Sequence, residues 1–285
     1  MTITKDTVTE CARYPAKRIC FAGDKNAASR RPKTLENYAH GIIQWPFCRG
    51  IDRMFPFPLS PSTPPTPDHT DAVWHRFKSE EDFSTATDWC NECGALIFLY
   101  DCLDISLALS FNFNFDIRCK TNLGELEYRA KSEECREAIE EISEKMATVI
   151  NRFEPLRSAD FICGVPAQAS KTFHLPHEIA RRVSELTEME NASGQFQFGL
   201  GKKSLANLGI EGKWDELVRV GISKPATTTP PMEPISLDGR SVLLIDDKYQ
   251  SGTTIQFVAA HLQQLGANKI YGLCAVKTMS DKDNT

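Results

Sequence analysis

The chain lacks any apolar run of about 18 residues, the length that a membrane-spanning helix needs, so no membrane span is expected. Its first residues, Met1 to Asp6, also lack the basic-then-apolar pattern of a secretory signal peptide. Charged and apolar residues make up 25% and 41% of the chain, proportions typical of a globular protein. The sequence therefore predicts a cytoplasmic globular protein that does not bind membranes.

A strong charge of one sign is also missing. The 33 Lys and Arg residues nearly balance the 38 Asp and Glu residues, which leaves a net charge of -5. Nucleic-acid binding proteins of globally basic character are thereby disfavoured. A local basic patch at Lys202, Lys203 and Lys213 keeps a nucleic-acid partner open without support from the net charge.

The sequence contains ten cysteines but only one C-x2-C pair, Cys90 and Cys93. This spacing is that of a zinc knuckle, and Cys102 is the third ligand that we predict for a Zn²⁺ site. In a reducing compartment the cysteines are not expected to form disulfides, so the alternative is a set of buried structural thiols. Other side chains that could complete a zinc site are Cys48, His69 and His75.

The first 120 residues are rich in cysteine and proline and are predicted to form an N-terminal accessory region. Residues 56–70 carry six prolines and read as a stiff, extended linker. From Leu107 to Phe115, apolar residues alternate as in a strand. The pattern leaves open whether this strand joins the main sheet or an accessory one.

The most informative stretch runs from Val242 to Thr254. Its four apolar residues, Val242 to Ile245, predict a buried strand, and the acids Asp246 and Asp247 follow directly. A short loop of small and hydroxyl residues then leads into an amphipathic helix with the apolar stripe Ile255, Val258, Ala259, Leu262 and Leu265, closed by Gly266. Ile270 to Val276 predicts another strand, so the whole forms one βαβ unit of a parallel sheet.

This arrangement suits a sugar phosphate. Hydroxyl and N–H groups of the loop can hold a phosphate at the helix N-terminus, where the helix dipole favours negative charge. Asp246 and Asp247 can accept hydrogen bonds from ribose hydroxyls or help to hold Mg²⁺. We assign the two acids a catalytic role. The predicted substrate-binding residues of the loop are Lys248, Tyr249, Gln250, Ser251, Gly252, Thr253 and Thr254.

The pattern resembles the phosphoribosyl-diphosphate binding motif of the type I phosphoribosyltransferases, in which an apolar strand is followed by two acids and then Thr-Gly-x-Thr. Ser251 replaces the first Thr and keeps its hydroxyl. Two positions depart from the family. Lys248 stands where an apolar residue is usual, and Gln250 stands where some members carry the acid that faces the base. The alternative is an ordinary α/β strand end with a fortuitous Asp pair.

A second segment fits the same family. Ala159 to Pro166 predicts a strand that ends in a turn, and His177 to Leu186 predicts a helix. In the family the intervening loop holds the pyrophosphate, which the resemblance assigns here to Ala167, Gln168 and Lys171. The alternative for Lys171 is a solvated loop lysine. Upstream, Ala138 to Ile150 carries the apolar stripe of a long helix.

The order of these segments, from about residue 123 to 278, looks like the ComF-like, competence-associated branch. It implies an α/β fold, a parallel sheet flanked by helices, as a core over residues 121–285. The irregular stretch at about 188–237, with Thr-Thr-Thr-Pro-Pro at 227–231, would be the hood that selects the acceptor base. The alternative is a plain insertion or a partner-binding loop.

Two functions follow. The first is an enzyme that binds phosphoribosyl diphosphate or a nucleotide 5′-phosphate and transfers ribose 5-phosphate to or from a nitrogen base. The second is a non-catalytic module that senses a nucleotide, or serves as a scaffold with a protein partner, in a DNA-processing or antiviral defence assembly. Turnover of phosphoribosyl diphosphate separates the two.

Overall fold

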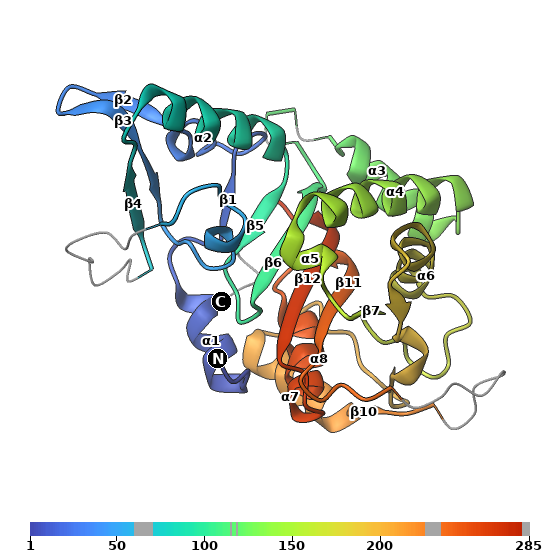
Figure 1. Cartoon of the computed structure of the whole chain (residues 1–285). Coiled ribbons are helices and arrows are strands. Elements are labelled where there is room, and N and C mark those ends of the chain that lie inside the picture. Colours follow the sequence, from blue (N-terminus) through green and yellow to red (C-terminus); the bar gives the residue numbers. More distant parts are fainter. Residues whose placement is uncertain (60–70, 115, 118, 226–234, 281–285) are drawn as a thin grey trace.

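The computed structural model describes residues 1–59, 71–114, 116–117, 119–225 and 235–280 (Figure 1). The predicted linker at 60–70, the candidate ligand His69, Phe115 and the run at 227–231 lie outside these residues. In the described part of the chain, the main sheet has seven strands in the order β1-β5-β6-β12-β11-β7-β8. Helices cover both of its faces, which confirms the predicted α/β class.

The centre of this sheet is parallel. It contains β6 (Ile105–Phe111), β12 (Lys269–Lys277), β11 (Ser241–Tyr249), β7 (Phe161–Gly164) and β8 (Glu190–Asn191). β11 lies between β12 and β7, and its residues Val242 to Ile245 are fully buried, as expected of an apolar strand with neighbours on both edges. The predicted central strand is therefore confirmed, although it continues four residues further than predicted, to Tyr249.

Two strands from the N-terminal part extend the sheet antiparallel beyond β6. These are β5 (Ile97–Leu99) and β1 (Arg18–Cys20). The strand predicted at 107–115 is thus part of the main sheet, but it ends at Phe111, and Phe113 is partly exposed. The division of the chain into an accessory region and a core at residue 120 stays a prediction.

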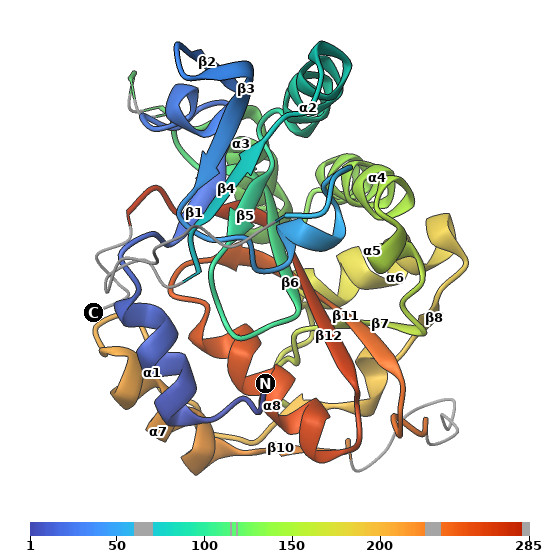
Figure 2. The ribbon, with the colours of Figure 1, turned by 60° about the vertical axis from the view of Figure 1, so that its left-hand side comes forward.

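Three further strands and one helix of the N-terminal part form a smaller layer above this edge (Figure 2). A second sheet contains β2 (Lys33–Leu35), β3 (Tyr38–Trp45) and β4 (Val73–Arg76), and α2 (Glu80–Cys93) packs beside it. Short 3₁₀ helices occur at Ala28–Arg30, Ile51–Arg53 and Ser193–Gln195.

Alternate side chains of β11 pack into two apolar cores, one on each face of the sheet. Leu243 and Ile245 face a core that is completed by α3 (Asn122–Ser132), α4 (Arg136–Arg152), α5 (Glu154–Arg157) and α6 (Leu175–Thr187). Val242 and Leu244 face the opposite core, with α1 (Lys5–Arg13), α7 (Ile210–Val220) and α8 (Thr253–Gln264). The short strands β9 (Gln197–Phe198) and β10 (Ile222–Ser223) pair with each other beside α7.

The two long predicted helices both form. In α4 the stripe of Ala138, Ile142 and Met146 is fully buried, and Glu141 and Lys145 pair on the outer face at 3.4 Å. In α8 the predicted stripe is buried except for Leu265, which is 45% exposed because the helix ends at Gln264. Gly266 follows with φ +98°, the left-handed conformation predicted for it. None of the helices within the described residues has the length and apolar character required to cross a membrane.

Candidate functional site

A cavity of about 660 Å³ opens beyond the carboxyl ends of β11 and β7. This is the edge of a parallel sheet at which ligands of open α/β folds bind. Five residues of the Asp246 to Thr254 segment line it together with the loop after β7, so the structure brings the two predicted segments together. The predicted ligand residues Ser251, Gly252 and Thr253 are not among the lining residues. The lining side chains that carry charge are Lys131, Glu134, Lys171, Lys202, Asp246, Asp247 and Lys248.

The two acids of β11 are adjacent but differ in their surroundings. The buried Asp247 carboxylate accepts a hydrogen bond and ion pair from Lys131. Within the described part of the chain Asp246 forms no ion pair, and its Oδ1 accepts the Asp247 backbone N–H at 2.9 Å. Burial, together with the Asp247 charge, raises the pKa of Asp246 to about 8. The pair can therefore present one carboxylate and one carboxyl group to a ligand near neutral pH.

Lys131 was missed in the sequence analysis. It occupies the last turn of α3, four residues after the buried Glu127, and this i,i+4 spacing was the only available signal. Burial lowers the pKa of Lys131, but the charge and hydrogen bond of Asp247 outweigh it and raise the pKa overall. Glu127 also binds Lys248 Nζ at 2.9 Å, so the predicted ligand residue Lys248 is held against α3 at the cavity wall.

The loop at the start of α8 has the geometry of an anion site. Gly252 adopts φ +72° as the residue before the helix and has no side chain to cap it, while Ser251 Oγ accepts the Thr253 N–H at 3.5 Å. The N–H groups of that turn have no partner within the helix. Ser251 and Thr253 share a hydrogen bond of 2.9 Å, and the buried Lys213 on α7 reaches Ser251 Oγ at 3.3 Å. Gln250 and Thr254 line the cavity itself.

Tyr249 does not line the cavity. Its buried side chain turns below the loop and its hydroxyl donates a hydrogen bond of 3.0 Å to Asp101. A Cβ atom at position 252 would collide with this hydroxyl. The predicted ligand contact of Tyr249 is therefore replaced by a structural one, in which its ring supports the loop from beneath.

The opposite wall of the cavity is basic. Lys171 is exposed on the loop after β7, and Lys202 faces it. Burial lowers the pKa of Lys202, and the charge of Asp246 acts in the opposite direction. The Lys202 ammonium also lies 4.1 Å from the centre of the Phe198 ring. These two lysines give the cavity its positive end.

Ala167 and Gln168 do not line the cavity. Gln168 supports the wall instead, since its Nε2 donates to the Lys202 carbonyl oxygen at 3.1 Å. His174, which the sequence analysis did not select, does line the cavity at the start of α6. Burial lowers the pKa of His174 to about 3, so its imidazole is neutral.

The predicted zinc site is not assembled. Cys90 and Cys93 lie in α2 within the apolar core that includes Phe98 and Trp89, whereas Cys102 belongs to the core on the other face of the sheet. In the described part of the chain, no three His, Cys, Asp or Glu side chains converge as metal ligands. Burial raises the pKa of Cys90 to about 12, as expected of a structural thiol. The C-x2-C spacing arises here from helix packing.

The site offers few protein oxygens for a magnesium ion. Asp246 and Asp247 offer carboxylate oxygens, the ligands that Mg²⁺ prefers, but Lys131 already neutralises Asp247. A cation here would take one or two protein oxygens and draw its other ligands from water and a bound diphosphate. The donor set therefore suits a metal ion that arrives with its phosphate ligand.

Comparisons with known proteins add the following. No protein-family model matches the sequence, and no characterised protein matches it in a sequence comparison. Among solved structures, a hypoxanthine phosphoribosyltransferase from Staphylococcus aureus aligns over 52% of this chain and 77% of its own, with 11% identity and a TM-score of 0.31. The hypoxanthine-guanine phosphoribosyl transferase of L. donovani aligns over 48% of this chain and 67% of its own, with 10% identity and a TM-score of 0.28.

Proposed function

We propose that the cavity binds the ribose 5-phosphate part of phosphoribosyl diphosphate or of a nucleoside 5′-monophosphate. The observation that carries this proposal is that Thr254 at the start of α8, an acid pair and two lysines line a single cavity of about 660 Å³. Each of these groups complements a different part of the ligand. An anion site alone would not account for the acid pair beside it.

The ligand can be oriented from these groups. The 5′-phosphate lies at the α8 start, where Ser251, Thr254 and the backbone N–H groups donate hydrogen bonds. The ribose hydroxyls donate to Asp246 and Asp247. The diphosphate, or a second anionic group, then points toward Lys171 and Lys202. Asp246 and Asp247 would hold a Mg²⁺ ion, which would neutralise charge on the diphosphate.

This orientation supports transfer of ribose 5-phosphate to or from a nitrogen base. The bond to the anomeric carbon breaks with positive charge developing on the sugar, as in glycoside hydrolysis. A carboxylate of the acid pair stabilises that charge, and Lys171 and Lys202 stabilise the leaving diphosphate. Bound Mg²⁺ supplies further charge neutralisation there.

Binding is tested by calorimetry with phosphoribosyl diphosphate and adenosine 5′-monophosphate, each with Mg²⁺. We expect micromolar binding of at least one ligand. Its loss in an Asp246→Asn, Asp247→Asn double variant that retains the wild-type circular dichroism spectrum would support the assignment. If neither ligand produces heat or a thermal shift in the wild type, the proposal is wrong.

A non-catalytic role is the second candidate, and Gln250 favours it. This residue lines the cavity with an amide, where the resemblance leads to an acid that faces the base. A nucleotide-sensing module of a DNA-processing or antiviral defence assembly would bind the same ligands without turnover. Product analysis with phosphoribosyl diphosphate, Mg²⁺ and a panel of purine and pyrimidine bases distinguishes the two candidates.

A further inference from the structure

Two cysteines that are 91 residues apart in the sequence meet outside the candidate cavity. The Cys102 thiol, in the turn between β5 and β6, donates a hydrogen bond to Cys11 on α1, and the two sulfur atoms lie 3.3 Å apart. Both side chains are buried. A disulfide would require the sulfur atoms to approach by about 1.3 Å.

Arg49 gives this thiol pair an electropositive setting. Its Nη1 atom lies 3.4 Å from Cys11 Sγ and donates to the Asp101 carbonyl oxygen at 2.7 Å. The hydrogen bond from Cys102 lowers the pKa of Cys11, and the Arg49 charge adds to this effect against the opposing effect of burial. The same hydrogen bond raises the pKa of Cys102. Of the two sulfur atoms, that of Cys11 therefore lies where negative charge is favoured, beside a guanidinium.

At two other buried cysteines the effect of burial dominates. Burial raises the pKa of Cys163 to about 12 and that of Cys20 to about 11. These thiols resemble inert structural cysteines. The contrast separates the Cys11–Cys102 pair from the cysteines that only fill the core.

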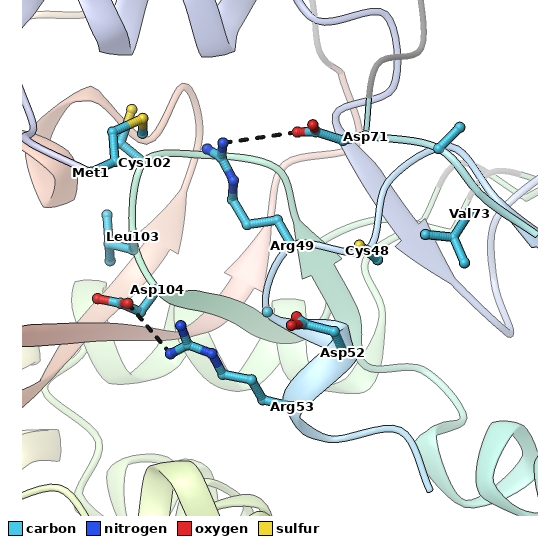
Figure 3. A pocket seen from close by; sticks show the side chains of 12 residues that line it. Met1, Cys48, Arg49, Asp52, Arg53, Asp71, Val73, Cys102, Leu103 and Asp104 are labelled. Atoms are coloured by element: carbon cyan, nitrogen blue, oxygen red, sulfur yellow. Dashed lines mark hydrogen bonds and ion pairs between the residues drawn. The ribbon is translucent and has the colours of Figure 1, made fainter. Parts of the chain in front are cut away.

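A second cavity, of about 370 Å³, reaches Cys102, one of the two thiols (Figure 3). Cys102 and Arg49 line it, with Leu103 and Asp104 on the same wall. Arg49 and Arg53 are held by Asp71 and Asp104 at 3.8 and 3.4 Å. The cavity thus gives a small uncharged molecule a route to the Cys102 sulfur, behind which Cys11 lies.

We propose that Cys11 and Cys102 form a redox-reactive dithiol that exchanges with low-molecular-weight disulfides entering the cavity beside Arg49. As Cys102 passes its proton to the Cys11 thiolate, its sulfur attacks one sulfur of the external disulfide R–S–S–R. The external S–S bond breaks, a thiolate RS⁻ leaves, and a mixed disulfide forms on Cys102. The Cys11 thiol then gives its proton to RS⁻, which becomes RSH.

The Cys11 sulfur completes the exchange by attacking the Cys102 sulfur and expelling the second RS⁻. The two cysteines lose two electrons in forming their disulfide, and the external disulfide gains them as it becomes RSH and RS⁻. The guanidinium of Arg49 stabilises the Cys11 thiolate before each of its two steps.

The test uses the full chain and bis(2-hydroxyethyl) disulfide, an uncharged reagent small enough for the cavity. After timed incubation and alkylation, non-reducing proteolysis and mass spectrometry quantify the Cys11–Cys102 linked peptide. The exposed Cys119 serves as an internal reference for an ordinary surface thiol. We expect the linked peptide to form at least tenfold faster than the Cys119 adduct.

Two pairs of variants sharpen the result. Cys11→Ser should trap the reagent on Cys102 as a stable mixed disulfide, whereas Cys102→Ser should leave Cys11 unmodified over the same period. Arg49→Gln should slow linkage at least tenfold, while Arg53→Gln, which changes the same cavity without touching Cys11, should not. The rate of linkage in the wild-type protein can be measured even if a variant fails to fold. Absence of the linked peptide while Cys119 reacts, or equal slowing by the two arginine variants, would overturn the proposal.

Discussion

The hydroxyl group of Tyr249 occupies the space in which a side chain at position 252 would begin, and it is fixed there by its hydrogen bond to Asp101. The tight turn between β11 and α8 therefore depends on a residue that never contacts the candidate ligand. Gly252 meets two demands at once: a left-handed backbone and the absence of a Cβ atom.

The first prediction concerns Gly252→Ala, with Gly239→Ala as the matched control. Both glycines have positive φ, +72° and +70°, but a Cβ atom at Gly239 would meet nothing within 4 Å. The control should lose about 1–2 kcal/mol of unfolding free energy through backbone strain alone. Gly252→Ala should lose about 1–3 kcal/mol more through the collision with Tyr249, and should also lose ligand binding. Urea denaturation measures the unfolding free energy of the two variants, and calorimetry measures ligand binding. Equal losses of unfolding free energy in the two variants would contradict the collision.

The second prediction concerns the pH dependence that Asp246 introduces. Its pKa is raised from 3.8 to about 8 in the folded protein, so the folded state holds this proton more tightly than the unfolded chain. The contribution of this proton to the unfolding free energy is complete below pH 3.8 and is lost as the pH rises through about 8. Asp246→Asn should therefore raise unfolding free energy at pH 9 by about 1–2 kcal/mol, since water in the open cavity reduces the full effect.

The measurement is thermal or urea unfolding at several values between pH 6 and pH 9. The variant should show a flatter profile than the wild type, with the difference growing toward pH 9. Asp238→Asn, at an exposed position, provides the control and should leave the profile unchanged. The prediction is wrong if the unfolding free energy of the wild type depends on pH no more steeply than that of Asp246→Asn. Asp246 would then have the same pKa in the folded and unfolded chain.

The third prediction separates two neighbouring lysines. Lys202 lines the candidate cavity, whereas Lys203 has an exposed side chain and contributes only its backbone N–H, to Glu216 at 2.7 Å. Lys202→Ala should weaken binding of phosphoribosyl diphosphate about tenfold, or about 1.4 kcal/mol, at low salt. Lys203→Ala should change the Kd less than twofold. Calorimetry at two salt concentrations checks this, and a loss shared equally by both variants would indicate general charge attraction only.

The fourth prediction tests the structural role of Cys90, whose side chain is fully buried. Cys90→Ala should lose about 1–2 kcal/mol of unfolding free energy through the small cavity that it leaves. Cys90→Ser should lose about 1–2 kcal/mol more, because its hydroxyl would be buried in an apolar core. A zinc ligand would behave differently: both substitutions would remove the metal and destabilise the protein equally. Denaturation curves with and without a chelator distinguish these outcomes.

The sequence predicted local features of the fold well where one segment contains the whole pattern. Val242 to Ile245, the α8 stripe and the left-handed Gly266 each follow from periodicity or from glycine's freedom, which a short window of sequence records. The same window shows two acids and a hydroxyl loop, and the structure places the acids at the carboxyl edge of the sheet, beside the candidate cavity.

Features that depend on distant partners could not be read in this way. The sequence does not show that Tyr249 reaches Asp101, that Lys131 pairs with Asp247, or that β5 and β1 pair with each other. Nor does spacing reveal the environment of a thiol: Cys90 and Cys93 have the separation of metal ligands but face Trp89 and Phe98. Each of these outcomes is set by tertiary packing, which outweighs the local pattern.

The pairing of β6 with β12 has a consequence for synthesis of the chain. Ile105 to Phe111 is made more than 150 residues before its parallel neighbour, Lys269 to Lys277. During translation the β12-facing edge of β6 therefore remains without its native partner, and the sheet can close only near the end of the process. Ribosome-bound chains that stop before residue 269 should be cleaved within β6 by a protease that leaves the finished protein intact. Protection at that stage would indicate that a temporary partner, such as a chaperone, covers the strand.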